Sequence, residues 1–189
     1  HGREEQALRA NFGVQVYANG EQFILVDESG SPIRGEELTA IMVTMVLTAY
    51  PRSSVVVPVQ ASAAVEQIAR RHDAKVIRTK ASPTALMEAC QTHSNVVLGG
   101  DMGFIFPQMH PGFDGMFSIA KIIEILTTQE RSLGQIRADL PRVIHRRYTV
   151  RCPWTVKGSL MRHLVETHAP ENLELIDGVK LVNYQDDNW

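Results

Sequence analysis

The sequence predicts an α/β fold in which helices cover a mixed, mostly parallel sheet, with parts of neighbouring domains on either side. Strand-like and helix-like segments alternate along the middle of the chain in the order β-α-β-α-β, and the connections between them are short. The ends of the chain instead combine hairpins with single helices. We therefore expect three parts, residues 1–52, 53–145 and 146–189, with the middle part as the α/β unit.

The first part is expected to form a hairpin followed by a helix. Residues 12–27 read as two strands, because Asn19 and Gly20 between them make the strongest short hairpin signal. After a second turn at residues 28–32, apolar residues recur with helical spacing until Pro51 ends the helix. These apolar residues are Leu38, Ile41, Met42, Met45, Val46 and Ala49.

The middle part supplies the predicted sheet and its covering helices. Ser62 and Ser82 are expected to cap two helices, and Asp114 is the expected N-cap of a longer apolar helix. Ser132 and Gln135 form a capping-box pattern for a short helix. Strands are expected at residues 55–59, 75–78, 96–98 and 104–107, and helices at 62–72, 83–92, 115–128 and from 132 to 141.

The last part is expected to form one helix and one hairpin. Residues 142–151, which carry four arginines and a histidine, are expected to form a basic edge or linker strand. A helix then follows Pro153, and a turn at Asp177 and Gly178 joins two short strands.

The candidate functional site is the glycine-rich turn after residues 96–98. Gly99 and Gly100 let the backbone turn sharply and let a ligand approach closely, and Asp101 then stands at the carboxyl end of a strand. In open α/β sheets, ligands bind at that edge. Taken alone, these residues also fit an ordinary hairpin that precedes a core helix.

Composition excludes several classes of partner. The formal net charge of −2 and the lack of a long basic run argue against nucleic acid and anionic membranes. Neither a long apolar span nor a signal-peptide pattern is present, and Cys90 and Cys152 lie far apart, so a reducing, cytoplasmic location is expected. The first residue is not methionine, which favours a piece of a longer protein.

The stretch VLGGDMGFIFPQMHPGFDGMF resembles the sugar-binding loop of the α-D-phosphohexomutases, which carries a GGE-x-S-G-H pattern and a later DG. It is most similar to the mutase-like module that some bacteria fuse behind a nucleotidyltransferase of the mannose-1-phosphate guanylyltransferase type. The resemblance implies that the middle part is like domain III of the family. It also implies that the Asp101 carboxylate accepts hydrogen bonds from sugar hydroxyls. The loop that carries it would contain Gly99, Gly100 and Gly103. The chain departs from the pattern at Gly103 and Phe104, where the family has Ser, Gly and His.

The first part resembles the end of the family's domain II, where a D-G-D-G-D-R loop holds magnesium. In this chain the three aspartates become Tyr17, Asn19 and Glu21. One carboxylate, one amide and one phenol would hold magnesium weakly, so no metal or other cofactor is expected in this chain. Magnesium is left open for the rest of the parent protein.

Two further stretches carry the resemblance. RTKASPTALMEA is similar to a substrate-facing loop, which leaves Arg78 and Lys80 as candidate phosphate contacts, although such residues are more often solvated charges. CPWTVKGSLMRHL and LIDGVKLV are similar to the start of domain IV. The family's phosphoserine loop would precede His1, and its phosphate-gripping loop would follow Trp189.

Three functions fit these observations. The first is a sugar-phosphate-binding, catalytically degenerate mutase-like module that contacts a hexose phosphate weakly and the rest of its own polypeptide, including a nucleotidyltransferase domain. The second is a piece of an active phosphomannomutase or phosphoglucomutase. The third is a structural or oligomerisation module, which leaves a homo-oligomer open.

Overall fold

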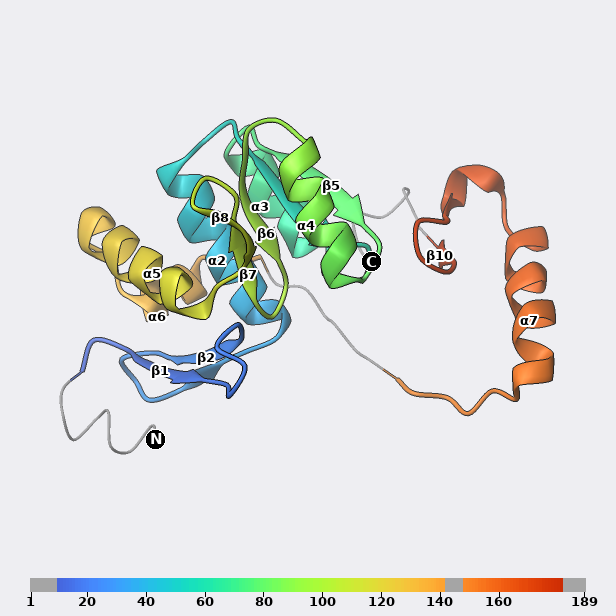
Figure 1. Cartoon of the computed structure of the whole chain (residues 1–189), viewed down its shortest axis with the longest axis horizontal. Helices are drawn as coiled ribbons and strands as arrows, with labels where there is room; N and C mark the ends of the chain where they lie inside the picture. The colour runs from blue at the N-terminus through green and yellow to red at the C-terminus, as the bar shows by residue number, and fades with distance from the viewer. Residues whose placement is uncertain (1–9, 142–147, 182–189) are drawn as a thin grey trace. The chain divides into compact units, whose positions relative to one another are not determined.

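The computed structural model describes residues 10–141 and 148–181 of the chain. The chain divides into two compact units, residues 1–143 and residues 144–189, both drawn in Figure 1. None of the helices within the described residues is long and apolar enough to cross a membrane.

The first unit is built on a five-stranded mixed sheet with the strand order β5-β4-β6-β7-β8. Its strands are β4 (Ser54–Pro58), β5 (Lys75–Thr79), β6 (Val96–Gly100), β7 (Phe104–Phe106) and β8 (His110–Phe113). β4 pairs in parallel with β5 and β6, whereas β7 and β8 continue the sheet in antiparallel fashion. The predicted α/β fold with a mixed sheet is confirmed.

The sequence does not predict β8. Pro111 and Gly112 lie in this strand, and such residues are typical of turns. β8 is the edge strand of the sheet. Proline has no amide hydrogen to donate to a neighbouring strand, and edge strands tolerate it because they have a neighbour on one side only.

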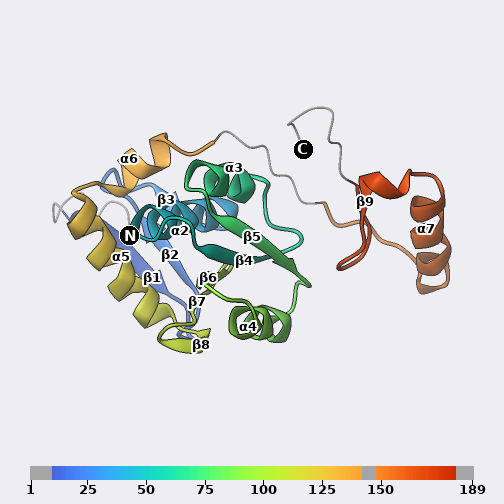
Figure 2. The ribbon, with the colours of Figure 1, turned by 90° about the horizontal axis from the view of Figure 1, so that it is seen from above.

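Within residues 10–141, five helices pack around this sheet, and Figure 2 shows α4 and α3 on opposite sides of β4 and β5. The helices are α2 (Glu36–Ala49), α3 (Ala64–Arg71), α4 (Pro83–Thr92), α5 (Gly115–Gln129) and α6 (Leu133–Ala138). Because side chains alternate along a strand, Val56 packs with α4, whereas Val55 and Val57 pack with the larger core that the other helices form.

Three of the four predicted helix caps are confirmed. The Ser82 hydroxyl and the Asp114 carboxylate each accept a hydrogen bond from the amide three residues further on, at 3.2 and 2.8 Å. Ser132 forms the predicted capping box with Gln135. The prediction for Ser62 differs by one position, because α3 has Ala63 as its N-cap and begins at residue 64.

α2 is the central helix of the unit. Its apolar spacing predicts one buried face, but nine of its fourteen residues are buried, among them Thr39. α2 contacts α3, α5, α6 and β6, so other elements surround it on most sides. The predicted boundaries after residues 52 and 145 stay predictions, but the contacts of α2 place it in the same unit as the sheet.

A small antiparallel sheet precedes α2. Its strands are β1 (Gly13–Val16), β2 (Phe23–Val26) and β3 (Pro32–Ile33). The predicted hairpin is confirmed, since the Tyr17 amide donates a hydrogen bond to the Gln22 carbonyl oxygen at 2.9 Å across the turn. The sequence does not predict β3, because a strand of two residues shows no alternation to recognise.

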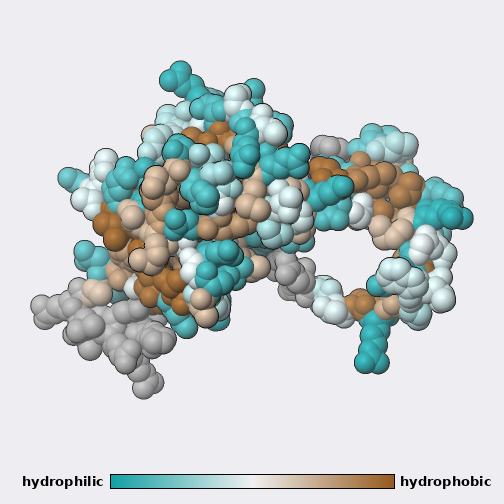
Figure 3. Space-filling model, viewed as in Figure 1, coloured by the Kyte–Doolittle hydropathy of each residue, from teal (hydrophilic) through white to brown (hydrophobic). Residues whose placement is uncertain are grey.

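The described residues of the second unit, 148–181, form one helix and one short hairpin. Its elements are α7 (Trp154–Glu166), the 3-10 turn η1 (Pro170–Asn172), β9 (Leu173–Glu174) and β10 (Lys180–Leu181). The predicted helix and hairpin are therefore present, with β9 and β10 antiparallel. No residue of α7 is buried, and apolar atoms of this unit are visible on its surface (Figure 3).

Part of the predicted basic strand lies outside the described residues. Residues 142–147 are not described, and residues 148–151 are in irregular structure. Residues 182–184, which belong to the predicted second strand of the last hairpin, also lie outside the described residues.

Asp27 connects the small sheet to the helices of the first unit. One of its carboxylate oxygens accepts hydrogen bonds from the Ser29 and Ser31 amides, both at 2.9 Å. The other pairs with Arg137 of α6 at 3.0 Å, and Arg137 also binds Glu37 of α2 at 2.6 Å. Burial raises the pKa of Asp27, but the hydrogen bonds from Ser29, Ser31 and Arg137 lower it by more, so the pKa lies below 3.8.

We expect Asp27→Asn to lower the free energy of unfolding at pH 7 by about 1–3 kcal/mol, because an amide replaces a carboxylate that several donors stabilise. A carboxyl group whose pKa falls on folding adds stability above its unfolded pKa, and this stability is lost as the pH drops through the folded value. The difference between wild type and variant should therefore be full at pH 7 and shrink below about pH 3.8. Urea unfolding followed by circular dichroism at pH 7 and pH 3 measures it. An equal difference at both pH values would contradict this role of the Asp27 charge.

Candidate functional site

A pocket of about 590 Å³ lies at the carboxyl edge of the parallel strands, and we call it the edge pocket. Its walls come from the ends of β4, β5 and β6, the start of α4, the edge strand β8 and the tip of the β1–β2 hairpin. This is the edge at which ligands bind in open α/β sheets. The lining residues are Glu21, Gln22, Pro58, Gln60, Ala81, Ser82, Pro83, Leu86, Met87, Asp101, Met102, Gly103, His110, Gly112 and Phe113.

The structure places Asp101 in the edge pocket, in the tight turn between β6 and β7. Its Oδ1 atom accepts a hydrogen bond from the Met102 amide at 2.7 Å, and its carbonyl oxygen accepts one from the Thr39 hydroxyl on α2. These two bonds fix the turn, while Oδ2 accepts no hydrogen bond from a described residue. Asp101 is therefore held in place with one carboxylate oxygen available to a ligand.

Close packing explains the glycines of this turn. Gly100 has a φ of +111°, and a Cβ atom there would lie 2.0 Å from the Gly103 carbonyl oxygen. A side chain at Gly99 would lie 2.2 Å from the Cys90 sulfur, so Gly99 packs against α4. Gly99 and Gly100 are not among the residues that line the edge pocket, whereas Gly103 is. Gly99 and Gly100 therefore allow the turn to form and to pack closely, but they do not face the pocket.

The tip of the β1–β2 hairpin packs directly against this turn. Gln22 and Gly103 form an antiparallel bridge between the small sheet and the large one. The Gly115 amide donates a hydrogen bond to the Gly20 carbonyl oxygen at 3.0 Å. A Cβ atom at Gly103 would lie 2.8 Å from the Glu21 carbonyl oxygen. The two sheets thus meet backbone to backbone, and the contact brings Glu21 and Gln22 into the edge pocket.

The residues of the hairpin tip do not fit a magnesium ion. The Asn19 side-chain oxygen accepts hydrogen bonds from the Glu21 and Gln22 amides at 3.2 and 3.4 Å, so the turn itself uses this oxygen. Tyr17 supplies a phenol, which leaves Glu21 as the single carboxylate. Magnesium prefers several hard oxygen ligands in octahedral geometry. Within the described part of the chain, no group of three or more His, Cys, Asp or Glu side chains is arranged to hold a metal ion.

Arg78 lies on β5 and contacts protein groups rather than the edge pocket. Its guanidinium forms a two-point ion pair with Glu66 of α3, at 2.8 and 2.9 Å. It also donates to the carbonyl oxygens of Pro58 and Ala61, at 2.9 and 2.7 Å. The side chain is only 11% exposed. Arg78 therefore anchors the loop between β4 and α3, and a phosphate would have to displace these bonds to reach it.

Lys80 is exposed and lies two residues before Ser82, but it does not line the edge pocket. The structure thus brings together Asp101, Gly103 and Glu21 from the predicted site residues. Arg78 and Lys80 lie outside the pocket, as do Tyr17 and Asn19.

Sequence reasoning missed four polar residues of the edge pocket. They are Gln22, Gln60, Ser82 and His110. Ser82 is recognisable as a helix cap, but the pattern gives no sign that it also faces a cavity. His110 lies on β8, and a Cβ atom at Gly112 would lie 2.8 Å from its Nε2 atom. The imidazole therefore lies over Gly112. This contact depends on the conformation of β8, so the sequence pattern does not predict it.

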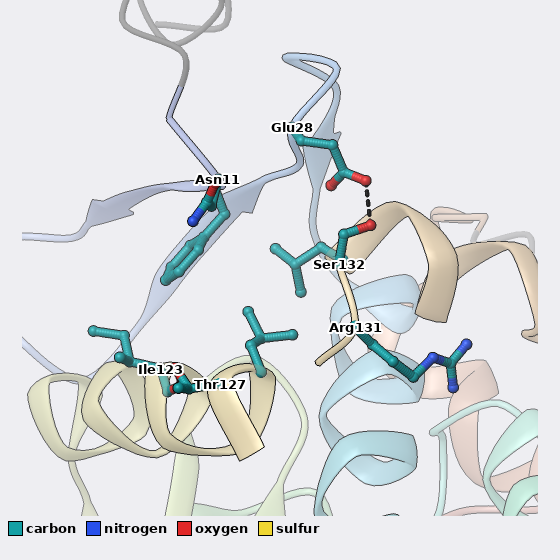
Figure 4. Close-up of a pocket in the computed structure, with 9 residues that line it drawn as sticks. Asn11, Glu28, Ile123, Thr127, Arg131 and Ser132 are labelled. Carbon is teal, nitrogen blue, oxygen red and sulfur yellow. Dashed lines mark hydrogen bonds between the residues drawn. The ribbon is translucent and has the colours of Figure 1, made fainter. Parts of the chain in front are cut away.

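A second pocket, of about 440 Å³, lies between β1, α5 and the start of α6 (Figure 4). The Glu28 carboxylate accepts hydrogen bonds from the Ser132 hydroxyl and from the Gly134 amide, the latter at 3.1 Å. Burial raises the pKa of Glu28, but these bonds lower it by more, so the pKa lies below its ordinary value. Arg131 points away from Glu28 in Figure 4 and pairs with Asp139. The charged groups at this pocket already have protein partners.

We expect Arg78→Lys to lower the free energy of unfolding by about 2–4 kcal/mol, because lysine cannot replace a planar group that binds a carboxylate and several carbonyl oxygens together. Lys80→Gln is the control, since the loss of a neighbouring exposed charge should change stability by no more than about 0.5 kcal/mol. Urea unfolding of both variants measures these changes. If Arg78→Lys were as stable as Lys80→Gln, the anchoring role of Arg78 would be refuted.

Comparisons with known proteins agree with this fold. The family model described as "Phosphoglucomutase/phosphomannomutase, alpha/beta/alpha domain III" matches residues 34–144, which is more than half of the chain. A "Probable phosphoglucosamine mutase" of Methanopyrus kandleri is 29% identical, with 99% of this chain and 42% of the relative covered. A "Phosphoglucomutase/phosphomannomutase" of Thermococcus kodakarensis is 28% identical, with 97% and 40% covered. The chain thus spans about two fifths of the length of these curated relatives.

Solved structures show the same fold. A phosphoglucomutase/phosphomannomutase family protein from Burkholderia thailandensis superimposes with a TM-score of 0.73 at 18% identity, and the match covers 96% of this chain and 40% of that one. A putative phosphomannomutase from Thermus thermophilus gives a TM-score of 0.60 at 15% identity, with 68% and 30% covered. The family predicted from the glycine-rich loop is confirmed by the match over the whole α/β unit. This chain therefore belongs to the phosphoglucomutase/phosphomannomutase family.

Proposed function

We propose that this chain is the sugar-binding centre of a phosphohexomutase-family protein, and that the edge pocket holds the hydroxyl groups of a hexose phosphate. The observation that carries the proposal is the position of Asp101, whose Oδ2 atom is available at the carboxyl edge of the sheet. A carboxylate accepts hydrogen bonds from neighbouring hydroxyls, and these charge-assisted bonds are stronger than those between neutral groups. The pocket volume of about 590 Å³ is in the range of small-molecule sites.

The chemistry that we assign to this chain is binding and orientation. The carboxylates of Asp101 and Glu21 accept hydrogen bonds from sugar hydroxyls. Further hydrogen-bond donors and acceptors around the sugar ring come from Gln22, Gln60 and Ser82. The donor set of the hairpin tip does not fit magnesium, so we derive no phosphoryl-transfer step in this portion. Catalytic degeneracy of the chain is thus part of the proposal, and its partners are a hexose phosphate and the remainder of its own polypeptide.

Two kinds of parent protein are consistent with this role. The chain resembles a mutase-like module that is fused to a nucleotidyltransferase, and that fusion remains a proposal from the sequence pattern. An active mutase is the second candidate, and a specific observation favours it. Curated relatives that align with almost the whole chain, and are more than twice as long, carry mutase names.

We expect glucose 6-phosphate and mannose 6-phosphate to shift the NMR amide signals of residues 99–104 and of Gln22. Asp101→Asn keeps the bond to the Met102 amide but removes the charge, so binding should weaken about tenfold. A ¹⁵N-¹H titration of wild type and variant measures both effects. Shifts that are confined to Arg78 and Lys80, or equal affinity of the variant, would show that the turn is purely structural.

We expect the 189-residue chain alone to interconvert no hexose phosphates, even with magnesium and a bisphosphate activator. The reason is that Tyr17, Asn19 and Glu21 supply one carboxylate where a magnesium site needs several oxygen ligands. A coupled spectrophotometric assay for glucose 6-phosphate formation tests this. Turnover that disappears in Glu21→Ala would establish a working site at the hairpin tip and reject the proposed degeneracy.

A further inference from the structure

The edge pocket has an apolar wall as well as its polar residues. Leu86 belongs to a small buried hydrophobic cluster between α4 and the large sheet, and Met87 and Phe113 pack against that cluster while partly exposed. All three of these side chains also line the edge pocket. The apolar wall is therefore the place where a packed cluster of the fold reaches the pocket.

The register of the sheet places the Phe113 side chain on the face that α4 covers. One row of paired residues crosses the sheet through Val56, Gly99, Ile105 and Phe113. Residues that pair directly across strands project from the same face. Val56 and Ile105 belong to the cluster under α4, so Phe113 lies on that face too. The row ends at Phe113, because β8 is the edge strand of the sheet.

The Phe113 ring also lies next to the turn that carries Asp101. A Cβ atom at Gly103 would lie 3.2 Å from the Cδ1 atom of Phe113, so the ring packs alongside this turn. Gly103 also forms the bridge with Gln22, which brings Glu21 into the pocket. One aromatic ring and two carboxylates are therefore gathered around Gly103.

Backbone contacts on both sides of Phe113 hold its ring in place. Phe113 pairs with Ile105 of β7, and the amide of the next residue, Asp114, donates a hydrogen bond to the Phe104 carbonyl oxygen at 3.1 Å. The Asp114 carboxylate caps α5, since it accepts a hydrogen bond from the Phe117 amide at 2.8 Å. Phe113 is thus preorganised, and a ligand that contacts it does not have to order this part of the chain.

We infer that Phe113 is a sugar-contacting residue whose ring packs against the C–H face of a closed pyranose ring, while Asp101 and Glu21 bind hydroxyls at the rim of that ring. This inference rests on the proposed function, since it concerns the same pocket. A glucopyranose ring carries its hydroxyls around the rim and C–H groups on its two faces. The face of an aromatic ring is weakly negative and attracts these positively polarised hydrogens, and the contact also removes apolar surface from water.

Such a contact discriminates between closed sugar rings and open chains. Glucose 6-phosphate is a pyranose in water, whereas sorbitol 6-phosphate has the same number of carbons and the same phosphate but cannot form a ring. Hydrogen bonds to the carboxylates do not by themselves favour the ring, because sorbitol 6-phosphate offers more hydroxyls. Only the pyranose presents a preformed C–H face, so we expect glucose 6-phosphate to bind about threefold more tightly.

The experiment is a ¹⁵N-¹H NMR titration of the full 189-residue chain with each compound at pH 7, with affinities taken from the signals of Gln22 and residues 99–104. Phe113→Leu keeps an apolar side chain but removes the flat ring, so the ratio of the two affinities should fall towards one. Phe117→Leu is the matched control, because Phe117 is also partly buried but packs against Phe106 and does not line the pocket. The control should keep the wild-type ratio.

A second measurement uses the wild type alone, so it does not depend on the stability of a variant. Protons that lie over the face of an aromatic ring resonate upfield, and Phe113 supplies the only phenyl ring among the described residues that line the pocket. The C–H signals of glucose 6-phosphate should therefore move upfield when the sugar binds.

Each result decides a different question. Equal affinity for the two compounds at the pocket signals, or a ratio that Phe113→Leu leaves unchanged, would overturn the inferred contact and leave the proposed function standing. An equal fall of the ratio in Phe117→Leu would also overturn it, because the effect would then reflect a general loosening of the fold. Binding of glucose 6-phosphate without upfield shifts would do the same. If neither compound shifts the pocket signals, the proposed function fails together with the inference.

Discussion

The edge pocket depends on one backbone contact, in which the tip of a hairpin from the small sheet meets a turn of the large sheet. The contact needs glycines, because Gly103 and Gly115 approach the carbonyl oxygens of Glu21 and Gly20 too closely for a side chain. Without it, the wall formed by Glu21 and Gln22 would be lost, and Asp101 would stand on an open edge. The site is therefore a property of two sheets together, although the carboxyl ends of the parallel strands provide its floor.

Two arginines connect further elements of this unit. Arg137 of α6 joins Asp27 next to β2 with Glu37 at the start of α2, so a single side chain connects the small sheet with two helices. Arg78 of β5 connects elements of the large sheet's own layers, because it holds the loop that leads from β4 into α3. Both arginines use the planar guanidinium to bind several oxygens simultaneously, which a lysine cannot do. Both guanidinium groups thus bind protein oxygens, and no lysine or arginine is among the described residues that line the edge pocket.

Local signals in the sequence predict most of the elements but not how they combine. The hairpin around Asn19, the caps at Ser82 and Asp114 and the capping box at Ser132 depend on residues that are close in sequence, so they are recognisable without a structure. β8 and the burial of α2 depend on pairing and packing with segments that are distant in sequence. The sequence alone therefore does not predict them. The candidate site follows the same division. Asp101 is predictable because it directly follows a strand, whereas His110 enters the pocket only through the pairing of β8 with β7.

The enclosure of α2 also bears on how this part of the protein was inherited. A helix that contacts α3, α5, α6 and β6 cannot be exchanged separately from them, because a new partner would have to fit its side chains on most sides at once. The family match begins at residue 34, just before this helix, and not at the first strand of the large sheet. Recombination that moves the α/β unit between proteins must therefore carry α2 along. The small sheet must move with it as well, because Phe23, Leu25 and Ile33 are buried in the same core as α2, and Asp27 pairs with Arg137 of α6.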